Sequence, residues 1–298
     1  MNFNQLRAFY QVARSGGFGS AATALHLTQP ALSWQVKNLE THLEVRLLER
    51  VGRRVTLTEE GRSLYGYAEQ IFNLARDAEE ALADFRGLGQ GRMRIDATFT
   101  FGDYHLPGLL LAFHRQHPRI VLEVQTGNTS QVLASTLRRE NDLAFVARDP
   151  AHPDIAAREV VRDELVAVVP PGHRLARQKS IPLRKLEGEG LIVRERGSSP
   201  REILDDLLAR RGISPRIVME SASTRAIKRM VEGGMGVAVL SQQVLREELQ
   251  AGSLRKVRLR DASIAYRFYL IHRKDKYLST ALQAFIAKSL GAPHGTDQ

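Results

Sequence analysis

Seven short runs of β-forming residues, separated by stretches with helical spacing, occupy most of the chain after residue 92. These runs are MRIDATF, IVLEVQT, DLAFVA, ELVAVVP, GLIVRE, RIVMES and GVAVLS. Alternation of strands and helices predicts parallel sheets whose faces are covered by helices. The larger part of the chain is therefore restricted to an α/β fold.

The first 45 residues show a different pattern, that of three short amphipathic helices. In the third, Thr28 can cap the first turn and Pro30 lies where no backbone donor is needed. Its apolar residues recur every three or four positions and are Leu32, Val36, Leu39 and Leu43. The opposite face carries Pro30, Ser33, Trp34, Lys37 and Thr41, and such a face suits a DNA groove better than a core. Three short helices with a tight turn before the third predict a helix-turn-helix.

The segment LLERVGRRVTLTEEG follows, and it alternates like a hairpin. Arg53 and Arg54 lie at the predicted turn beside Gly52, where they could contact phosphates or a minor groove. We therefore predict a wing. The alternative is a solvated basic turn without a ligand. The predicted DNA contacts are Thr28, Gln29, Pro30, Ser33, Trp34, Lys37, Arg53 and Arg54.

The overall net charge of +10 is a weak indicator of DNA binding, because its distribution is uneven. We count seven Lys/Arg against three Asp/Glu in residues 1–58, three against seven in 59–90, and 33 against 23 in 91–298. Most of the excess therefore lies outside the predicted DNA module. The 298 residues contain no cysteine, no long apolar run and no signal-like N-terminus, so we expect about two domains and a cytoplasmic protein without membrane contact.

The acidic segment after the wing predicts one long helix. Thr58 can cap it, and its apolar residues Leu64, Ala68, Ile71, Ala75, Ala78, Leu82 and Phe85 alternate at spacings of four and three. Such a seam favours pairing with the same helix of a second copy. Packing of the seam on its own domain is the alternative.

From Met1 to about Leu290 the chain resembles the LysR-type transcriptional regulators. The resemblance is carried by LRAFYQVARSGGFGSAATALHLTQPALSWQVKNLE, RRVTLTEEG, GNTSQVLASTL and VEGGMGVAVLS. It implies a winged helix-turn-helix and a long dimerisation helix, followed by an α/β effector region of two lobes like those of periplasmic binding proteins. It also implies a homotetramer on double-stranded promoter DNA, with RNA polymerase as a further candidate partner. The sequence departs from the family pattern at Trp34, and at Glu44 and Leu48, where Gly and Phe are common.

The sequence patterns and the resemblance together predict that the chain is divided into four segments. We expect a DNA-binding domain at 1–58, a linker helix at 59–86, a hinge at 87–91 and an effector-binding domain at 92–298. Lobe I of that last domain is expected at about 92–162 and 267–290, and lobe II at about 163–266.

Ligands of open α/β sheets bind at the carboxyl ends of strands, so polar residues that follow the strands are candidates for an effector site. They are Thr98, Thr100, Asn128, Thr129, Arg194, Ser198, Ser199, Arg201, Ser223 and Thr224. Each hydroxyl group could instead cap a helix. Converging helix N-termini and the basic charge of this half favour a small anionic effector, with Arg194 and Arg201 as its cations.

Catalytic and metal sites are not expected, and neither is a cofactor other than the effector. The pair His114 and His117 has no third ligand at a suitable spacing, and the GGMG stretch predicts a tight turn. No GxxxxGK[ST], GxSxG or HExxH motif is present. A ligand-responsive DNA-binding regulator is the favoured function. One alternative is a module that binds a metabolite and does not bind DNA. A less favoured alternative is a hydrolase whose Ser, His and Asp residues cannot be identified from a sequence motif.

Overall fold

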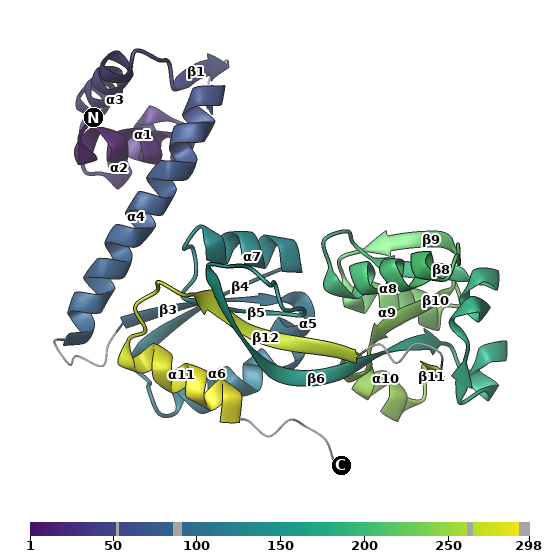
Figure 1. The fold of residues 1–298 in the computed structure, drawn as a ribbon. Helices are drawn as coiled ribbons and strands as arrows, with labels where there is room; N and C mark the ends of the chain where they lie inside the picture. The colour runs from purple at the N-terminus through teal and green to yellow at the C-terminus, as the bar shows by residue number, and fades with distance from the viewer. Residues whose placement is uncertain (52–53, 86–90, 261–264, 292–298) are drawn as a thin grey trace. The chain divides into compact units, whose positions relative to one another are not determined.

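The structure is a computed structural model that describes residues 1–51, 54–85, 91–260 and 265–291 (Figure 1). It consists of two compact units, Met1–Glu79 and Glu80–Gln298, each of which is described by itself. Among the described residues, no helix is both long enough and apolar enough to cross a bilayer.

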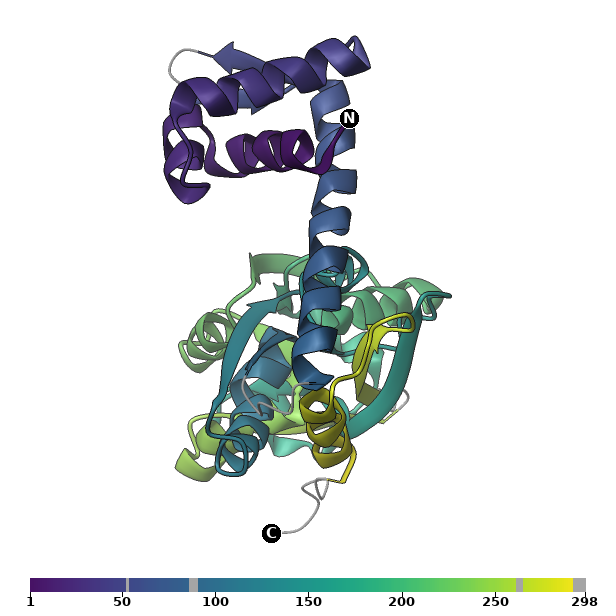
Figure 2. The same cartoon turned by 90° about the vertical axis from the view of Figure 1, so that its left-hand side faces the viewer.

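The first unit contains the three expected short helices, α1 (Phe3–Ser15), α2 (Phe18–Ala24) and α3 (Gln29–Leu43). Asn2 forms a capping box with Gln5 at the start of α1, and Thr28 Oγ1 accepts a hydrogen bond from the Ala31 amide at the start of α3. The apolar faces of the helices form one core, to which α3 contributes Leu32, Val36 and Leu39. These three helices and the hairpin gather around the first turns of the next helix (Figure 2).

The predicted hairpin is formed by β1 (Leu48–Val51) and β2 (Arg54–Leu57), with Leu48 paired to Leu57. Helix α4 (Glu59–Phe85) follows at once. The predicted Thr58 cap is present, because Thr58 Oγ1 accepts a hydrogen bond from the Gly61 amide at 2.9 Å. Gly61 has to be a glycine, since a Cβ atom there would lie 2.0 Å from the Leu47 carbonyl oxygen. The α4 helix is thereby packed closely on the strand-forming segment.

The apolar surface of α4 differs from the predicted seam. Leu64 and Ala68 pack into the core of the first unit, as the alternative reading allowed. Among the α4 side chains that the structure describes, up to residue 82, the large apolar ones that remain exposed are Tyr67, Ile71, Leu74 and Leu82. In the first half of α4, the exposed apolar side chains therefore lie on a different face from the predicted seam, because Leu64 and Ala68 of the seam are used for the core of the first unit.

In the second unit, the strands of lobe I are β3 (Gly91–Thr98), β4 (Ile120–Gly127) and β5 (Leu143–Val146). They are parallel, with β3 in the middle. The helices of lobe I are α5 (Phe99–Tyr104), α6 (Leu106–His114), α7 (Thr129–Leu137) and α11 (Thr280–Gly291). Helix α7 covers one face of the sheet, and α6 and α11 cover the other (Figure 1).

The elements of lobe II are β7 (Ser180–Ile181), β8 (Gly190–Arg194), β9 (Arg216–Ser221), β10 (Val237–Ser241), β11 (Arg255–Leu259), α8 (Ser199–Arg210), α9 (Thr224–Glu232) and α10 (Arg246–Ala251). Three 3₁₀ helices complete it, η1 (Arg174–Arg177), η2 (Leu183–Gly188) and η3 (Gln242–Leu245). Strands β9, β8 and β10 are parallel, which confirms the prediction for this lobe. The GGMG turn is also confirmed, because Gly234 has a φ of +76° and a Cβ at Gly236 would lie 2.2 Å from the Gly190 carbonyl oxygen.

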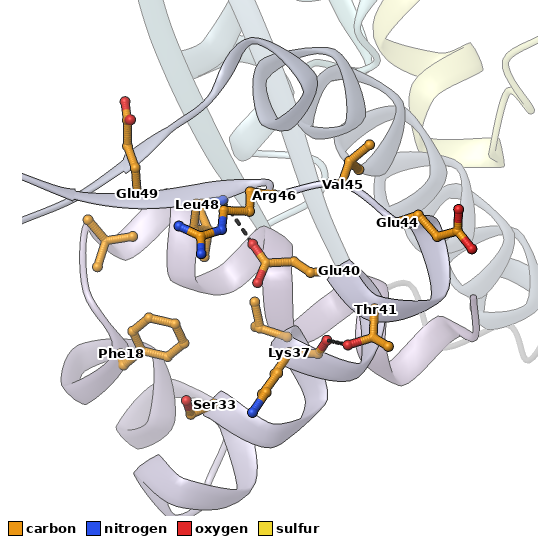
Figure 3. A pocket seen from close by; sticks show the side chains of 12 residues that line it. Phe18, Ser33, Lys37, Glu40, Thr41, Glu44, Val45, Arg46, Leu48 and Glu49 are labelled. Carbon is orange, nitrogen blue, oxygen red and sulfur yellow. Dashed lines mark hydrogen bonds between the residues drawn. The ribbon is translucent and has the colours of Figure 1, made fainter.

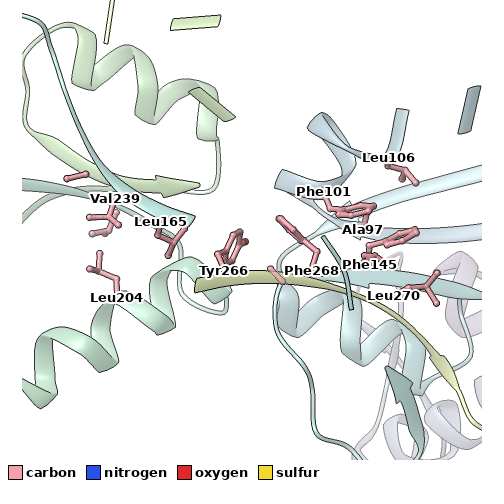
Figure 4. Packing of buried hydrophobic residues seen from close by; sticks show 14 of the residues in the cluster. Ala97, Phe101, Leu106, Phe145, Leu165, Leu204, Val239, Tyr266, Phe268 and Leu270 are labelled. Atoms are coloured by element: carbon pink, nitrogen blue, oxygen red, sulfur yellow. The ribbon is translucent and has the colours of Figure 1, made fainter. Parts of the chain in front are cut away.

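Two long antiparallel strands, β6 (Ile155–Val169) and β12 (Ala265–Arg273), run from one lobe into the other. The expectation of purely parallel sheets is therefore wrong at the centre, where β12 pairs antiparallel to both β5 and β6. Tyr266 and Phe268 of β12 are buried where the lobes meet (Figure 4). The predicted lobe boundaries fall inside these shared strands. Of the predicted hinge, residues 87–90 lie outside the described part, and Gly91 already begins β3.

Candidate functional site

Helix α3 presents an exposed polar face opposite its buried apolar one. Leu32 and Leu39 are completely buried, whereas Gln29, Pro30, Ser33 and Lys37 are exposed. Trp34 has 65% of its surface exposed, although it is the only tryptophan of the chain. A large indole left in water on a well-packed helix has no structural role in this unit. The whole face is free to contact a partner.

A hollow of about 540 Å³ lies between α3 and β1 (Figure 3). Ser33 and Lys37 line it from the helix, and Leu48 and Glu49 line it from the strand. Its polar floor has a structural role, because Glu40 Oε1 accepts hydrogen bonds from the Leu47 and Leu48 amides at 2.8 and 3.1 Å. The Glu40 carboxylate thus fixes the start of the wing relative to the exposed face of α3. Nothing in the sequence pattern indicated this role.

The turn between α3 and β1 depends on a backbone conformation that glycine would adopt more easily. Glu44 ends α3 with a φ of 57° and a ψ of 26°, in the left-handed region. Its amide donates a hydrogen bond to the Glu40 carbonyl oxygen. A residue with a Cβ atom is strained by about 1–2 kcal/mol in this region. The departure from the family pattern at Glu44 therefore keeps the geometry of the turn and stores strain in it.

The predicted basic tip of the wing lies mostly outside the described residues. Arg53 is not among them, and of Arg54 only the backbone is described, in β2 opposite Val51. The contact of these two arginines with DNA stays a prediction.

In the second unit, the two lobes meet through the first turns of α7 and α8. Thr129 Oγ1 and Ser199 Oγ lie 2.8 Å apart and share a hydrogen bond. Beside them, the Ser130 amide donates to the Gly197 carbonyl oxygen at 3.3 Å. Two of the four predicted hydroxyl clusters are thus brought together, one from each lobe.

A second group of predicted residues surrounds Arg194, which is only 5% exposed at the end of β8. Its Nη1 donates to Thr224 Oγ1 at 2.9 Å, and its Nε donates to the Glu195 carboxylate at 2.8 Å. The guanidinium carbon also lies 5.8 Å from the centre of the Phe99 ring, which belongs to lobe I. Arg194 therefore joins a hydroxyl of lobe II to an aromatic ring of lobe I.

Arg201, in contrast to Arg194, contacts residues of its own lobe, lobe II. Its Nε donates to Asp205 at 2.6 Å, and its Nη1 donates to Glu220 at 3.1 Å and to the Arg194 carbonyl oxygen at 2.9 Å. Arg194 and Arg201 are each buried beside a carboxylate of their own lobe, and their role as cations of an effector site stays a prediction. Sequence spacing could have indicated the Arg201–Asp205 pair, which are four residues apart on one helix.

The first predicted cluster lies next to the shared strands. Thr98 is 5% exposed and its Oγ1 atom has no hydrogen-bond partner among the residues that the structure describes, so it does not act as a cap for α5. The Thr100 side chain is hydrogen-bonded with the hydroxyl of Tyr266 on β12, and burial raises the pKa of Tyr266. Burial likewise raises the pKa of Asp163 on β6, although a hydrogen bond from Ser241 opposes the shift. Buried polar groups therefore line the strands between the lobes.

The remaining predicted residues divide between capping and other contacts. Asn128 and Ser223 are helix caps, accepting hydrogen bonds from the Gln131 and Ala226 amides. Ser198 precedes α8 but makes no side-chain cap bond. The capping alternative is thus correct for two of the four clusters.

One contact between the lobes was missed entirely from the sequence. Lys228 of α9 is 5% exposed, and its Nζ donates to Tyr104 Oη of lobe I at 3.3 Å and to the Val244 carbonyl oxygen at 2.8 Å. Its carboxylate partner is Glu248, at 2.6 Å. A lysine on an otherwise ordinary helix gives no signal of such a contact.

Two family models match most of the chain. Residues 3–62 match the family model described as bacterial regulatory helix-turn-helix protein, lysR family, and residues 86–290 match the LysR substrate binding domain. The transcriptional activator CmpR of Synechocystis sp. is 35% identical over 95% of this chain and 93% of its own length.

Two solved structures are similar as well. The regulatory domain of Synechocystis CcmR, in complex with 2-PG, is 31% identical and covers 67% of this chain and 96% of that chain with a TM-score of 0.64. Full-length CbnR, complexed with its target DNA, is 25% identical and covers 97% of this chain and 99% of that chain with a TM-score of 0.70.

Proposed function

The chain belongs to the LysR-type family of transcriptional regulators, and from that premise we propose which residues bind promoter DNA and which bind the effector. The exposed face of α3 carries the proposal. It offers a hydroxyl, an amide, an indole and an ammonium group to the edges of base pairs, while the opposite face is buried. The wing then contacts the sugar-phosphate backbone through Arg53 and Arg54.

We propose that Gln29, Ser33 and Lys37 lie in the major groove and that Thr28 and Pro30 set the first turn of α3 against the backbone. Gln29 and Ser33 can each donate and accept hydrogen bonds, whereas Lys37 only donates and prefers guanine. The similarity to CbnR, whose full-length structure contains its target DNA, supports this orientation.

We propose that the effector is a small anion that binds where the lobes meet. The N-termini of α7, α8 and α9 all lie beside the residues that join the lobes, and helix N-termini favour negative charge. Thr98 Oγ1, buried and without a partner, is a hydrogen-bonding group that a ligand could satisfy. The related regulatory domain that was solved in complex with 2-PG supports a small-molecule site in this domain.

Effector binding would act by favouring one arrangement of the lobes about β6 and β12. A ligand shifts such an equilibrium only by its difference in affinity for the two arrangements, and coupling energies of about 1–3 kcal/mol are typical. Thr129, Ser199 and Lys228 are positioned to differ between the arrangements, because they carry the contacts from lobe to lobe.

We also propose pairing of two copies through α4 and a homotetramer on the promoter in the cytoplasm, with RNA polymerase as the next partner. The support is the exposed apolar stripe of Tyr67, Ile71, Leu74 and Leu82 on a helix of 27 residues. A water-exposed stripe of this length favours association with a second helix.

A binding assay on the intergenic DNA upstream of the gene tests the DNA function, with Trp34 fluorescence as readout. We expect a blue shift of the indole emission on binding, because the exposed ring loses water. Ser33→Ala and Gln29→Ala should weaken binding to this DNA more than binding to random DNA. Equal losses on both would mean that α3 does not read bases, and absence of any binding would favour a metabolite-binding module without DNA.

A thermal-shift screen of the full chain tests the effector site. Small carboxylates, sulfur oxyanions, phosphates and phosphonates should include a compound that raises the melting temperature. Thr100→Val and Thr129→Val should remove its effect on DNA binding while leaving basal DNA binding unchanged. A normal response in both variants would exclude this site.

A further inference from the structure

The basic charge of the second unit gathers on a surface that neither the base-reading face nor the effector site uses. Residues 174–185, RLARQKSIPLRK, contain five cations and no carboxylate. Residues 255–260, RKVRLR, contain four cations and again no carboxylate. These two segments therefore hold much of the positive charge that remained unexplained in this half of the chain.

The fold brings the two segments side by side. Strand β11 pairs with β7, with Arg258 opposite Ser180, and the Arg258 amide donates to the Lys179 carbonyl oxygen at 3.2 Å. Along β11 the apolar residues Val257 and Leu259 are buried, whereas Lys256, Arg258 and Arg260 are exposed. Since side chains alternate along a strand, these three cations form one outward row. We call Arg177, Lys179, Lys256, Arg258 and Arg260 the β11 face.

The cations of the β11 face lie together on one surface without carboxylate partners among the described residues. Arg92, Arg138 and Arg148 lie within 3.5 Å of Glu123, Glu140 and Glu202, respectively. Among the described residues, no member of the β11 face forms an ion pair, and Lys256 donates only to the Gln242 side chain. Unpaired like charges repel each other, so their accumulation on one surface favours an anionic partner.

The composition of the β11 face favours phosphate groups over an acidic protein. The cores of protein interfaces are enriched in aromatic residues and methionine and depleted in lysine. No large apolar side chain is exposed in residues 174–185 or 255–260. Contacts to phosphate need only cations, and alternate residues of a strand lie about 6.6 Å apart, close to the axial rise of about two phosphates in one DNA strand.

We infer that the β11 face binds the phosphate backbone of duplex DNA, as a second contact besides the helix-turn-helix. This inference rests on the proposed DNA-binding function, and it deepens it. The contact would carry no sequence information. It would add affinity to promoter and random DNA alike.

The test compares two triple variants of the full chain on a long promoter fragment. The first is Lys256→Gln, Arg258→Gln and Arg260→Gln. The matched control is Arg115→Gln, Arg119→Gln and Arg210→Gln, three exposed arginines elsewhere on the unit for which no ion pair is present in the described part of the chain. Both variants lose three charges at surface positions, and circular dichroism should report unchanged folding.

We expect the β11 variant to reduce the slope of log K against log salt by about 2–3, since each phosphate contact contributes about 0.9. The control should change the slope by much less. The β11 variant should also keep the preference for the promoter over random DNA, because phosphate contacts carry no sequence information.

Equal slopes for the two triple variants on the long fragment would overturn the inference. Loss of transcription activation with an unchanged slope would also overturn it, because the partner would then be an acidic protein. Failure of the wild-type chain to bind any DNA would instead refute the proposed function, so the two failures are distinguishable.

Discussion

Thr129 and Ser199 join the two lobes of the effector domain through one hydrogen bond between their hydroxyl groups, at 2.8 Å. Each residue stands in the first turn of a helix, and the helices belong to different lobes. Ser199 is completely buried. The bond therefore joins the two lobes where we propose that the effector binds.

A double-mutant cycle with Thr129→Val and Ser199→Ala should measure this contact. A buried hydrogen bond between neutral groups contributes about 0.5–1.5 kcal/mol, so we expect a coupling energy of this size in urea unfolding. As control, Thr136→Val pairs with Ser199→Ala, because Thr136 bonds only to its own helix at Val132. Additive effects of Thr129→Val and Ser199→Ala would show that the lobes are not held by this bond.

Asp142→Asn should be among the most destabilising polar substitutions in the chain. Asp142 is 5% exposed and accepts hydrogen bonds from Arg94 Nη2 and Lys276 Nζ, each at 2.7 Å. Burial alone would raise the pKa of Asp142, but Lys276 and Arg94 outweigh it and the pKa is lowered. Removing one partner of a buried ion pair costs about 3–5 kcal/mol.

The measurement is urea unfolding of the full chain at neutral pH. Glu123→Gln is the control, since its ion pair with Arg92 is exposed and such pairs contribute about 0–1 kcal/mol. The anchoring role of Asp142 would be refuted by a similar, small loss in both variants. Because Arg94 also donates to Glu80 of α4 at 3.1 Å, the same network fixes the end of that helix to β3.

Local periodicity was enough to predict the buried and exposed faces of α3 and seven strands of the second unit, but not β7, β11 and β12. The buried and exposed faces of α3 follow directly from the spacing of Leu32, Val36 and Leu39. Capping residues such as Thr58 could also be identified, because their partners are three residues away.

Contacts between distant segments could not be predicted in this way. The charged residues Arg162, Asp163 and Glu164 interrupt the apolar pattern of β6, so only the second half of that strand was recognised. The pairing of β12 with β5 and β6, the contact of Lys228 with Tyr104, and the contact of Arg194 with Thr224 depend on three-dimensional neighbours. Residue type at one position carries no signal of them.

Stability should fall on mild acidification because of His105. Its ring stacks on Phe101 and lies beside Phe268, with ring centres 5.2 and 5.3 Å away. Its Nε2 atom is buried and has no hydrogen-bond partner within the described part of the chain. Burial, assisted by Arg246, lowers the pKa of His105 to about 4. The unfolded chain binds a proton at its ordinary pKa of about 6.5, so stability is lost as the pH falls from about 6.5 toward about 4.

His105→Phe should remove this part of the pH dependence. Between pH 7.5 and 5.5, we expect the free energy of unfolding to decrease by about 1 kcal/mol less in the variant than in wild type. His114→Phe makes the same substitution at an exposed histidine of the same unit and serves as control. Parallel pH profiles for wild type and His105→Phe would mean that the buried ring is not the proton-linked group.

Glu44→Gly should stabilise the first unit while leaving DNA recognition intact. Glu44 holds the left-handed conformation in which a Cβ atom costs about 1–2 kcal/mol, and a glycine relieves that cost. Glycine also has more conformational freedom in the unfolded chain, which lowers the free energy of unfolding by about 0.4–1 kcal/mol. The net gain in stability should therefore be about 0.5–1 kcal/mol. Glu44→Ala is the matched control, because it removes the carboxylate but keeps the Cβ atom. If the alanine variant gained as much as the glycine variant, charge at the hollow between α3 and β1, and not backbone strain, would be the cause.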